Sequence, residues 1–317
     1  MKYKVFVDGQ EGTTGLKIHD YLVNRPEIEL MKIDQEKRKD TAERSRFLNE
    51  ADLVFLCLPD AASREAVSLI HNDTTRVIDA STAFRTDPTW TYGLPELNKG
   101  QRAAIRGSRR VAVPGCHATG FVAALYPLVN SGIVPSDYPT SCFSLTGYSG
   151  GGKSLINKYE NNQTTSSLNS PRPYALHLHH KHLPEMQRIP GLENPPVFTP
   201  IVANYYKGMA VSVPLVTRLL TKKLSAEKIR DFFCEYYQGE AFIRVMPYDA
   251  EAKLDGGFLP VEDCNDTNRI DLYVFGHDDQ ILIVSRLDNL GKGASGAAIQ
   301  NMNIMLGTDE AAGLKAE

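Results

Sequence analysis

The sequence places one cysteine where a nucleophile would be activated. Cys116 lies in the segment VPGCHATG, directly after a strand-like run and before a helix-like run. A helix N-terminus attracts negative charge and therefore favours the thiolate over the thiol. A lone cysteine is more often a small buried apolar residue, so the Pro-Gly turn before it and His117 after it carry the argument for a nucleophile.

A second chemical group is the run HLHHKHLPE, from His177 to Glu185, which holds four of the eight histidines within six positions. General acid/base work beside Cys116, metal binding and a solvated loop are the three interpretations. The run has no neighbouring cysteine and no HExxH spacing, which makes zinc the weaker alternative. We therefore predict no metal site.

The turn after the first predicted strand is rich in glycine. Gly9, Gly12 and Gly15, with Thr13 among them, form a GxxGxxG pattern that opens a predicted helix. Backbone NH groups in such a turn can approach a pyrophosphate at the helix N-terminus. The spacing departs from GxGxxG, and similar turns occur without a ligand. With its strand-turn-helix context, we predict that these four residues bind a dinucleotide.

The end of the second predicted strand carries two conflicting signals for the cofactor. Asp34 is an acidic residue of the kind that bonds the ribose 2′-hydroxyl of NAD, whereas Lys37, Arg38 and Lys39 suit a 2′-phosphate. A solvated charged loop is the third interpretation.

The segment GYSGGGKS, from Gly147 to Ser154, satisfies the P-loop pattern GxxxxGKS. A P-loop also needs a strand that ends in a magnesium-binding aspartate, and Asp278 looks instead like part of a hairpin turn. The glycines could alternatively close over a nicotinamide or a substrate, with Lys153 facing an anion. Arg85, after the predicted strand in IDASTAFR, suits bidentate recognition of phosphate, although a surface arginine would look the same.

The elements that must position these residues alternate as strands and helices through the first third of the chain. This alternation predicts an α/β fold with a parallel sheet covered on both faces. The pattern changes after the helix-like ATGFVAALYPLVNSG, and we place a domain boundary near Cys116. Beyond it we predict an irregular polar stretch from Asn161 to Pro200, the helix SAEKIRDFFCEYYQGE, an antiparallel hairpin of RIDLYVFG and QILIVSRLD, and a final helix ASGAAIQNMNIMLG.

Bulk composition favours a protein that handles small molecules. The 317 residues suffice for two domains, and the formal net charge of -3 lacks the basic footprint of a nucleic-acid binder. No run reaches the roughly 18 apolar residues of a membrane span, and the start MKYKVFVDG does not look like a signal peptide, so we expect a cytoplasmic protein. The five cysteines are widely spaced and indicate neither a disulfide framework nor a structural zinc site.

Eight segments together resemble one enzyme family, the short form of N-acetyl-γ-glutamyl-phosphate reductase of arginine biosynthesis. They occur in order between Val5 and Gly307, nearly the whole chain, and are VDGQEGTTGLKIHDYL, CLPDAAS, IDASTAFR, YGLPELN, VAVPGCHATGF, LTGYSGGGK, HHKHLPEM and GKGASGAAIQNMNIMLG. The resemblance implies a Rossmann dinucleotide-binding domain over residues 1–116 plus 290–317. It also implies a glyceraldehyde-phosphate dehydrogenase-like α/β catalytic domain over 117–289.

The resemblance further implies site residues and a cofactor. The nucleophile would be Cys116, with His180 as the acid/base and His182 in reserve. The cofactor would be NADP, with its 2′-phosphate on Arg38. Other implied positions are Ser149, Gly150 and Gly151 near the nicotinamide, Asn301 at its carboxamide, Arg85 at the substrate phosphate and Lys153 at the substrate.

The implied reaction reduces an acyl phosphate to an aldehyde through a cysteine thioester, in a homo-oligomer that is a dimer or a tetramer. One departure concerns the residue after the nucleophile, which is aromatic in longer members of the family and is His117 here. The role of His117 is left open.

Three alternatives compete with this interpretation. A relative of aspartate-semialdehyde dehydrogenase would share the cysteine, the histidine and the cofactor but act on a shorter acyl phosphate. A P-loop phosphotransferase would bind ATP and Mg²⁺ and use Lys153. A cofactor-binding sensor would have lost Cys116 or the histidines, and both are present.

Overall fold

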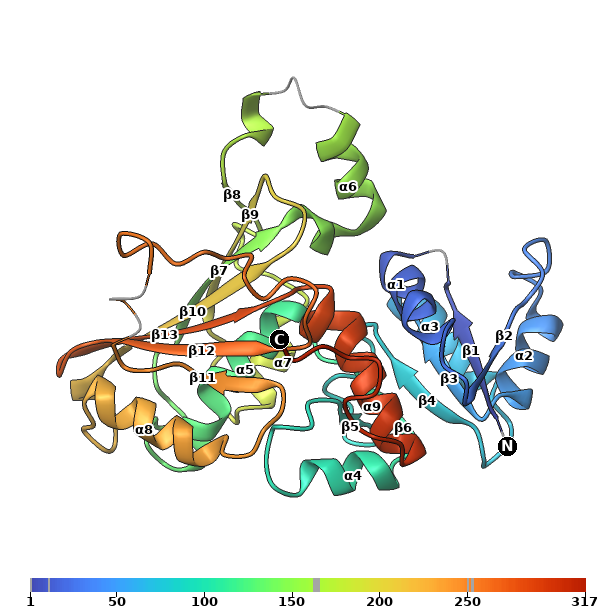
Figure 1. Ribbon diagram of the computed structural model, residues 1–317, viewed down its shortest axis with the longest axis horizontal. Helices are drawn as coiled ribbons and strands as arrows, with labels where there is room; N and C mark the ends of the chain where they lie inside the picture. The colour runs from blue at the N-terminus through green and yellow to red at the C-terminus, as the bar shows by residue number, and fades with distance from the viewer. Residues whose placement is uncertain (1, 11, 162–165, 250, 252–253) are drawn as a thin grey trace. The chain divides into compact units, whose positions relative to one another are not determined.

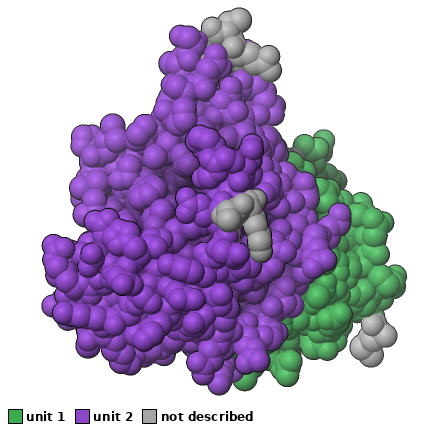
Figure 2. Space-filling view, turned by 60° about the vertical axis from the view of Figure 1, so that its left-hand side comes forward, with its two compact units in different colours: residues 1–95, 100–114, 294–314 green, residues 96–99, 115–293, 315–317 purple. Residues whose placement is uncertain are grey.

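The computed structural model describes residues 2–10, 12–161, 166–249, 251 and 254–317. They form two compact units, which Figure 2 shows in different colours. Unit 1 comprises residues 1–95, 100–114 and 294–314, and unit 2 comprises residues 96–99, 115–293 and 315–317.

Unit 1 is built on a six-stranded sheet in the order β2-β1-β3-β4-β6-β5, and every neighbouring pair of strands is parallel. Short buried runs such as LVFL in β3 suit strands that are covered on both faces. The strands are β1 (Tyr3–Asp8), β2 (Ile28–Met31), β3 (Leu53–Leu56), β4 (Arg76–Asp79), β5 (Thr91–Tyr92) and β6 (Arg110–Ala112).

Helices cover both faces of this sheet. Alternate side chains of a strand point to opposite faces, and accordingly Val5 and Val7 of β1 belong to one apolar cluster while Phe6 belongs to another. The first cluster includes residues of α1, α4 and α9, and the second includes residues of α2 and α3. The predicted parallel α/β sheet is confirmed. The helices are α1 (Thr13–Leu22), α2 (Thr41–Glu50), α3 (Asp60–Ser68), α4 (Gln101–Gly107) and α9 (Gly296–Leu306).

Unit 2 contains a seven-stranded mixed sheet in the order β11-β12-β13-β10-β7-β9-β8 (Figure 1). The pairs β11/β12 and β7/β9 are parallel and the others are antiparallel. The predicted hairpin is confirmed as β12 and β13. The strands are β7 (Ser141–Gly147), β8 (Arg172–Pro173), β9 (Val197–Ala203), β10 (Met209–Val216), β11 (Ile243–Val245), β12 (Ile270–Gly276) and β13 (Gln280–Leu287).

The helix α5 lies unusually close to this sheet. It packs on β10 and β13, and a Cβ built on Gly120 would come within 2.7 Å of the Val211 side chain. Ser285 of β13 donates a hydrogen bond to the carbonyl oxygen of Gly120 at 2.8 Å. The helical segments of unit 2 are α5 (Cys116–Asn130), η1 (Tyr148–Gly151), α6 (Gly152–Asn161), η2 (Ser166–Leu168), α7 (Leu183–Arg188), η3 (Thr217–Leu219) and α8 (Ala226–Tyr236), and the π-helix η5 (Gly291–Ser295) leads into α9.

One expectation about an irregular segment is wrong, and one helix lies where the sequence predicted no element. The polar basic stretch after β2 contains the helix α2, because Asp40 caps its N-terminus by accepting a hydrogen bond from the Glu43 amide at 2.7 Å, and Phe47 and Leu48 supply the buried side. The stretch from Asn161 to Pro200 contains β8, α7 and the start of β9. Its residues 162–165 lie outside the described part of the chain. None of the helices described is long and apolar enough to cross a membrane.

Candidate active site

Cys116 is the first residue of α5, in unit 2. Gly115 is the N-cap, and its amide donates to Oε1 of Glu185 at 2.9 Å. Glu185 lies in the first turn of α7 and is only 1% exposed. Because α7 begins directly after His182, the last histidine of the run, this hydrogen bond fixes the histidine segment to the turn that carries the thiol.

The π-helix η5 passes directly beside the nucleophile. A Cβ built on Gly293 would come within 2.8 Å of the Cβ of Cys116, so no larger residue fits without displacing one of them. The neighbouring Lys292 is fully buried and donates to both carboxylate oxygens of Glu96 at 2.7 and 2.8 Å. Gly293 thus makes room for the start of α5.

His117 is sealed inside unit 2. Its Nδ1 is 2.8 Å from the hydroxyl of Ser144 and its Nε2 is 2.9 Å from the hydroxyl of Tyr174. Burial lowers the pKa of His117 to about 3, and the proximity of the ionisable groups of His180 and Lys181 disfavours its protonated form further. His117 is therefore neutral at physiological pH, and it does not exchange protons as a general acid or base there.

His180 and His182 lie beside His117. The ring centroids of both are 5.6 Å from that of His117, and the two are 4.8 Å from each other. The backbone amide of His182 donates to Nδ1 of His180 at 3.1 Å, which places the proton of a neutral His180 on Nε2. This hydrogen bond must open before Nδ1 can be protonated.

The other two histidines of the run, His177 and His179, are exposed. Only half of the run therefore belongs to the cluster around His117. Within the described residues, no group of three or more histidine, cysteine, aspartate or glutamate side chains could hold a metal ion.

The glycine segment after β7 is held by a neighbouring loop. Ser149 is buried, its amide donates to the Tyr206 carbonyl at 2.9 Å, and Asn289 donates to its hydroxyl at 3.0 Å. A Cβ on Gly150 would make only ordinary contacts, whereas one on Gly151 would overlap the Leu155 side chain. Lys153 is exposed in the first turn of α6.

The glycine turn of unit 1 has the close approaches that its pattern predicts. Gly9 has a φ of +90°, and a Cβ there would lie 2.4 Å from the Cys57 carbonyl oxygen. A Cβ on Gly15 would lie 2.4 Å from the Gly9 carbonyl oxygen, and Gly12 is the N-cap of α1. The buried Thr13 hydroxyl makes no hydrogen bond to any residue that the structure describes. A donor left over at a helix N-terminus fits a phosphate group.

Three further predicted residues lie elsewhere in unit 1. Arg38 is half-buried in the turn after β2, where Asp34 accepts a hydrogen bond from the Glu36 amide at 3.1 Å. Arg85 is 8% exposed and donates to the carbonyl oxygens of Val113 and Ala80 at 2.9 and 3.1 Å.

The third, Asn301, is fully buried in α9. Its Nδ2 donates to the carbonyl oxygens of Gly93 and Ala297 at 2.8 and 2.7 Å. Its Oδ1 has no hydrogen-bond partner among the described residues. Both hydrogen bonds of Nδ2 thus hold the fold together, and Oδ1 is the atom that could accept a hydrogen bond from a ligand.

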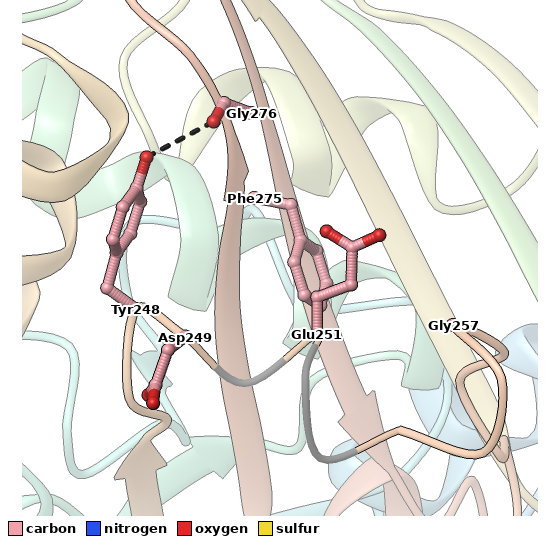
Figure 3. Close-up of a pocket in the computed structure, with 6 residues that line it drawn as sticks. All are labelled: Tyr248, Asp249, Glu251, Gly257, Phe275 and Gly276. Atoms are coloured by element: carbon pink, nitrogen blue, oxygen red, sulfur yellow. Dashed lines mark hydrogen bonds between the residues drawn. The ribbon is translucent and has the colours of Figure 1, made fainter.

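A separate cavity of unit 2, of about 530 Å³, contains none of the predicted site residues (Figure 3). The Tyr248 hydroxyl at its edge donates to the Gly276 carbonyl at 3.2 Å. Its described lining offers two carboxylates and no nucleophile, namely Tyr248, Asp249, Glu251, Gly257, Phe275 and Gly276.

Sequence reasoning missed three residues of the cluster, Glu185, Ser144 and Tyr174. Glu185 stands three positions after His182, a spacing typical of an acidic residue in the first turn of a helix, and that signal could have found it. Ser144 and Tyr174 stand 27 and 57 positions from His117, in segments without any distinctive pattern.

The parallel sheet with its glycine turn and the cysteine at a helix start occur in a chain that matches the semialdehyde dehydrogenase class in both of its parts. The semialdehyde dehydrogenase NAD-binding domain family matches residues 4–105, and the semialdehyde dehydrogenase dimerisation domain family matches residues 116–289. The chain therefore has an NAD-binding domain and a domain that forms homo-oligomers in this class.

Full-length relatives define the family more narrowly. The chain is 48% identical to N-acetyl-gamma-glutamyl-phosphate reductase 2 of a Nostoc species, over 99% of each chain. It is 45% identical to the protein of that name from Pseudomonas putida, over 98% of each. The chain belongs to the N-acetyl-γ-glutamyl-phosphate reductase family, as the resemblance implied.

Solved structures show the same fold at low identity. Aspartate semialdehyde dehydrogenase II of Vibrio cholerae, complexed with ASA, gives a TM-score of 0.70 at 16% identity, over 96% of this chain and 98% of that one. The Candida albicans aspartate semialdehyde dehydrogenase with NADP gives 0.66 at 17%, over 96% and 99%. The chain thus resembles aspartate-semialdehyde dehydrogenases in fold alone. The family assignment takes the place of the phosphotransferase alternative.

The hydrogen bond between Gly115 and Glu185 yields a prediction. Glu185→Ala leaves a buried amide without its acceptor, which costs about 1–3 kcal/mol, and frees the turn before Cys116. We expect a lower melting temperature and at least a roughly 10-fold slower turnover. Glu185→Gln keeps an oxygen acceptor and should retain most of both. Equal losses in the two variants, measured by calorimetry and steady-state kinetics, would contradict this role.

Proposed function

We propose that this chain catalyses the NADPH-dependent reduction of N-acetyl-γ-glutamyl phosphate to N-acetylglutamate 5-semialdehyde and phosphate, a step of arginine biosynthesis. The observation that carries the proposal is Cys116 at the N-terminus of α5, with His180 and His182 beside its neighbour His117. The relatives with 44–48% identity bear the name of this reductase.

The first half of the reaction is acyl transfer to the thiol. The Cys116 thiolate attacks the γ-acyl carbon and an S–C bond forms. The bond between this carbon and the bridging oxygen of the phosphate breaks, and inorganic phosphate leaves. The amides at the start of α5 stabilise the oxyanion, because helix N-terminal NH groups carry partial positive charge. Arg85 and Lys153 are our candidates for holding the substrate phosphate and the rest of the substrate.

The second half releases the aldehyde. When bound, NADPH supplies the hydride that reduces the thioester carbon. The histidine pair supplies a proton to the oxyanion that hydride addition leaves, which gives the hemithioacetal hydroxyl. Cys116 Sγ then leaves as the thiolate, and the hydroxyl proton returns to the histidine pair as the aldehyde forms. We assign this proton to His180, which has to open its hydrogen bond with the His182 amide to accept it at Nδ1. That requirement makes His182 the alternative base.

The cofactor residues are proposed from the turn in unit 1. Gly9, Gly12 and Gly15 let the backbone approach the pyrophosphate, and the Thr13 hydroxyl supplies a further donor. Arg38 would bind the 2′-phosphate. Near the nicotinamide, Ser149, Gly150 and Gly151 would contact the ring and Asn301 would accept from the carboxamide through Oδ1.

Domain roles follow from the same assignment. We propose unit 1 as the NADP-binding domain and unit 2 as the catalytic domain. The dimerisation family of residues 116–289 supports a homodimer or a homotetramer. A small-molecule biosynthetic role is consistent with a cytoplasmic enzyme.

The decisive assay is phosphate-dependent reduction of NADP⁺ by N-acetylglutamate 5-semialdehyde, with aspartate semialdehyde as the comparison substrate. The wild-type protein should prefer the N-acetylated aldehyde. Cys116→Ser should abolish turnover and leave NADPH binding nearly intact, since an alcohol is a far weaker nucleophile at neutral pH. Activity above about a few per cent of wild type in the serine variant would refute the covalent mechanism.

The histidine pair gives a second prediction. His180→Asn should lower kcat by roughly 100-fold to 10,000-fold and remove one limb of the pH profile of kcat, with little change in substrate binding. A chelator should leave the wild-type enzyme active, whereas a metal site would lose activity and regain it with zinc. If His180→Asn stays active and His182→Asn does not, the base is His182.

Cofactor choice gives a third prediction. Arg38→Ala should raise the Kd of NADPH much more than that of NADH, because only NADPH carries the 2′-phosphate. Fluorescence titration with both cofactors measures this. Arg46→Ala is the matched control, because that exposed arginine of α2 pairs with Glu43 and Glu50. Equal effects of Arg38→Ala on both cofactors would show that the basic turn is only solvated.

A further inference from the structure

Three side chains of unit 2 form one hydrogen-bonded chain next to the nucleophile. The Ser144 hydroxyl of β7 bonds Nδ1 of His117, and Nε2 of His117 bonds the Tyr174 hydroxyl. Ser144 and His117 are buried, whereas Tyr174 is partly exposed. Of the three, Tyr174 is the one that a bound molecule can reach.

Buried Ser144 sets the direction of this chain. A neutral imidazole has one donor and one acceptor, so one hydroxyl must donate to His117 and the other must accept from it. Ser144 is 0% exposed and makes no side-chain hydrogen bond to another described residue. If it accepted from His117, its own proton would be buried without an acceptor, which costs about 1–3 kcal/mol. Ser144 therefore donates to Nδ1.

The tautomer of His117 follows. With Nδ1 as the acceptor, the ring proton is on Nε2 and is donated to the Tyr174 oxygen. The Tyr174 hydroxyl proton is then left over, and it makes no hydrogen bond to the described residues. Burial and the proximity of the Cys116 sulfur hold the pKa of Tyr174 above its ordinary range, so this proton stays in place.

The backbone after Tyr174 is strained. Ala175 and Leu178 have φ values of 53° and 57°, which residues other than glycine rarely adopt. The segment is held by hydrogen bonds from the Tyr174 amide to the Pro200 carbonyl at 3.0 Å and from the Leu178 amide to the Ala175 carbonyl at 2.9 Å. Such strain persists where the surroundings fix it and is common at functional sites.

We propose that Tyr174 is a substrate-contacting residue whose hydroxyl donates a hydrogen bond to the acyl oxygen of the substrate on Cys116, with Ser144 and His117 as the positioning residues that orient it. This inference rests on the proposed function for the identity of the acyl group. It gives His117 a defined task, which is to pass the orientation set by Ser144 on to Tyr174.

The tautomer can be read without any substrate. Nitrogen-15 NMR of the imidazole rings, with His117→Gln to assign the signal, should show His117 protonated on Nε2. In Ser144→Ala the donor to Nδ1 is gone, so the preference of His117 for the Nε2-protonated form should weaken and its nitrogen-15 signals should move toward those of a tautomer mixture. An Nδ1-protonated His117 in the wild-type protein overturns the proposal.

The kinetic test is a double-mutant cycle with N-acetylglutamate 5-semialdehyde. Tyr174→Phe should lower kcat about 100-fold with little change in KM, the size expected for one lost oxyanion donor. Ser144→Ala should also lower kcat, and adding it to Tyr174→Phe should cause no further loss, because it acts through the phenol. Ser212→Ala, another buried serine of the same sheet, is the control and should keep wild-type kcat.

Two kinetic outcomes overturn the inference. One is a Tyr174→Phe variant within about 3-fold of wild-type kcat, and the other is additive losses in the double variant. If the wild-type protein fails to oxidise the N-acetylated aldehyde, the proposed function fails, and the NMR measurement still decides the direction of the chain.

Discussion

The close packing of α5 on the mixed sheet is the constraint from which the site follows. Gly120 allows the helix to approach Val211 to a distance that any Cβ would prevent, and Ser285 bonds its backbone. The helix axis is thereby fixed, and its first residue, Cys116, is fixed with it. The partial positive charge of a helix N-terminus acts within about one turn. A small shift of the thiol would therefore weaken the stabilisation of its thiolate by the helix.

Two further contacts hold the beginning of this helix from different parts of unit 2. Glu185 accepts from the Gly115 amide, and Gly293 lies against the Cys116 Cβ. The segment of Gly293 is itself secured by the buried pair of Lys292 and Glu96. A buried ion pair is weak evidence for stability, because desolvation offsets the attraction, but it does restrict how the segment can pack. Each of these contacts restricts the position of the Cys116 thiol.

Burial divides the histidines into different kinds of group. His117 is enclosed and stays neutral, with its pKa lowered to about 3, and both its ring nitrogens are bonded to hydroxyl groups. His180 is only partly buried and its Nδ1 is bonded to a backbone amide, while His177 and His179 are solvated. The four histidines of the run thus separate into one candidate acid/base pair, His180 and His182, and two exposed residues, His177 and His179.

The sequence by itself determined the parallel sheet, the hairpin of β12 and β13 and the position of Cys116 between a strand and a helix, because periodicity and turn residues are local signals. The sequence did not reveal α2, because its many polar residues outnumber the buried Phe47 and Leu48. It also did not reveal the short elements within residues 161–200. Only the tertiary structure decided the partners of the nucleophile turn. Glu185, Ser144 and Tyr174 reach Gly115 and His117 across 70, 27 and 57 positions, and hydrogen bonds over such separations depend on how segments pack and leave no spacing to read.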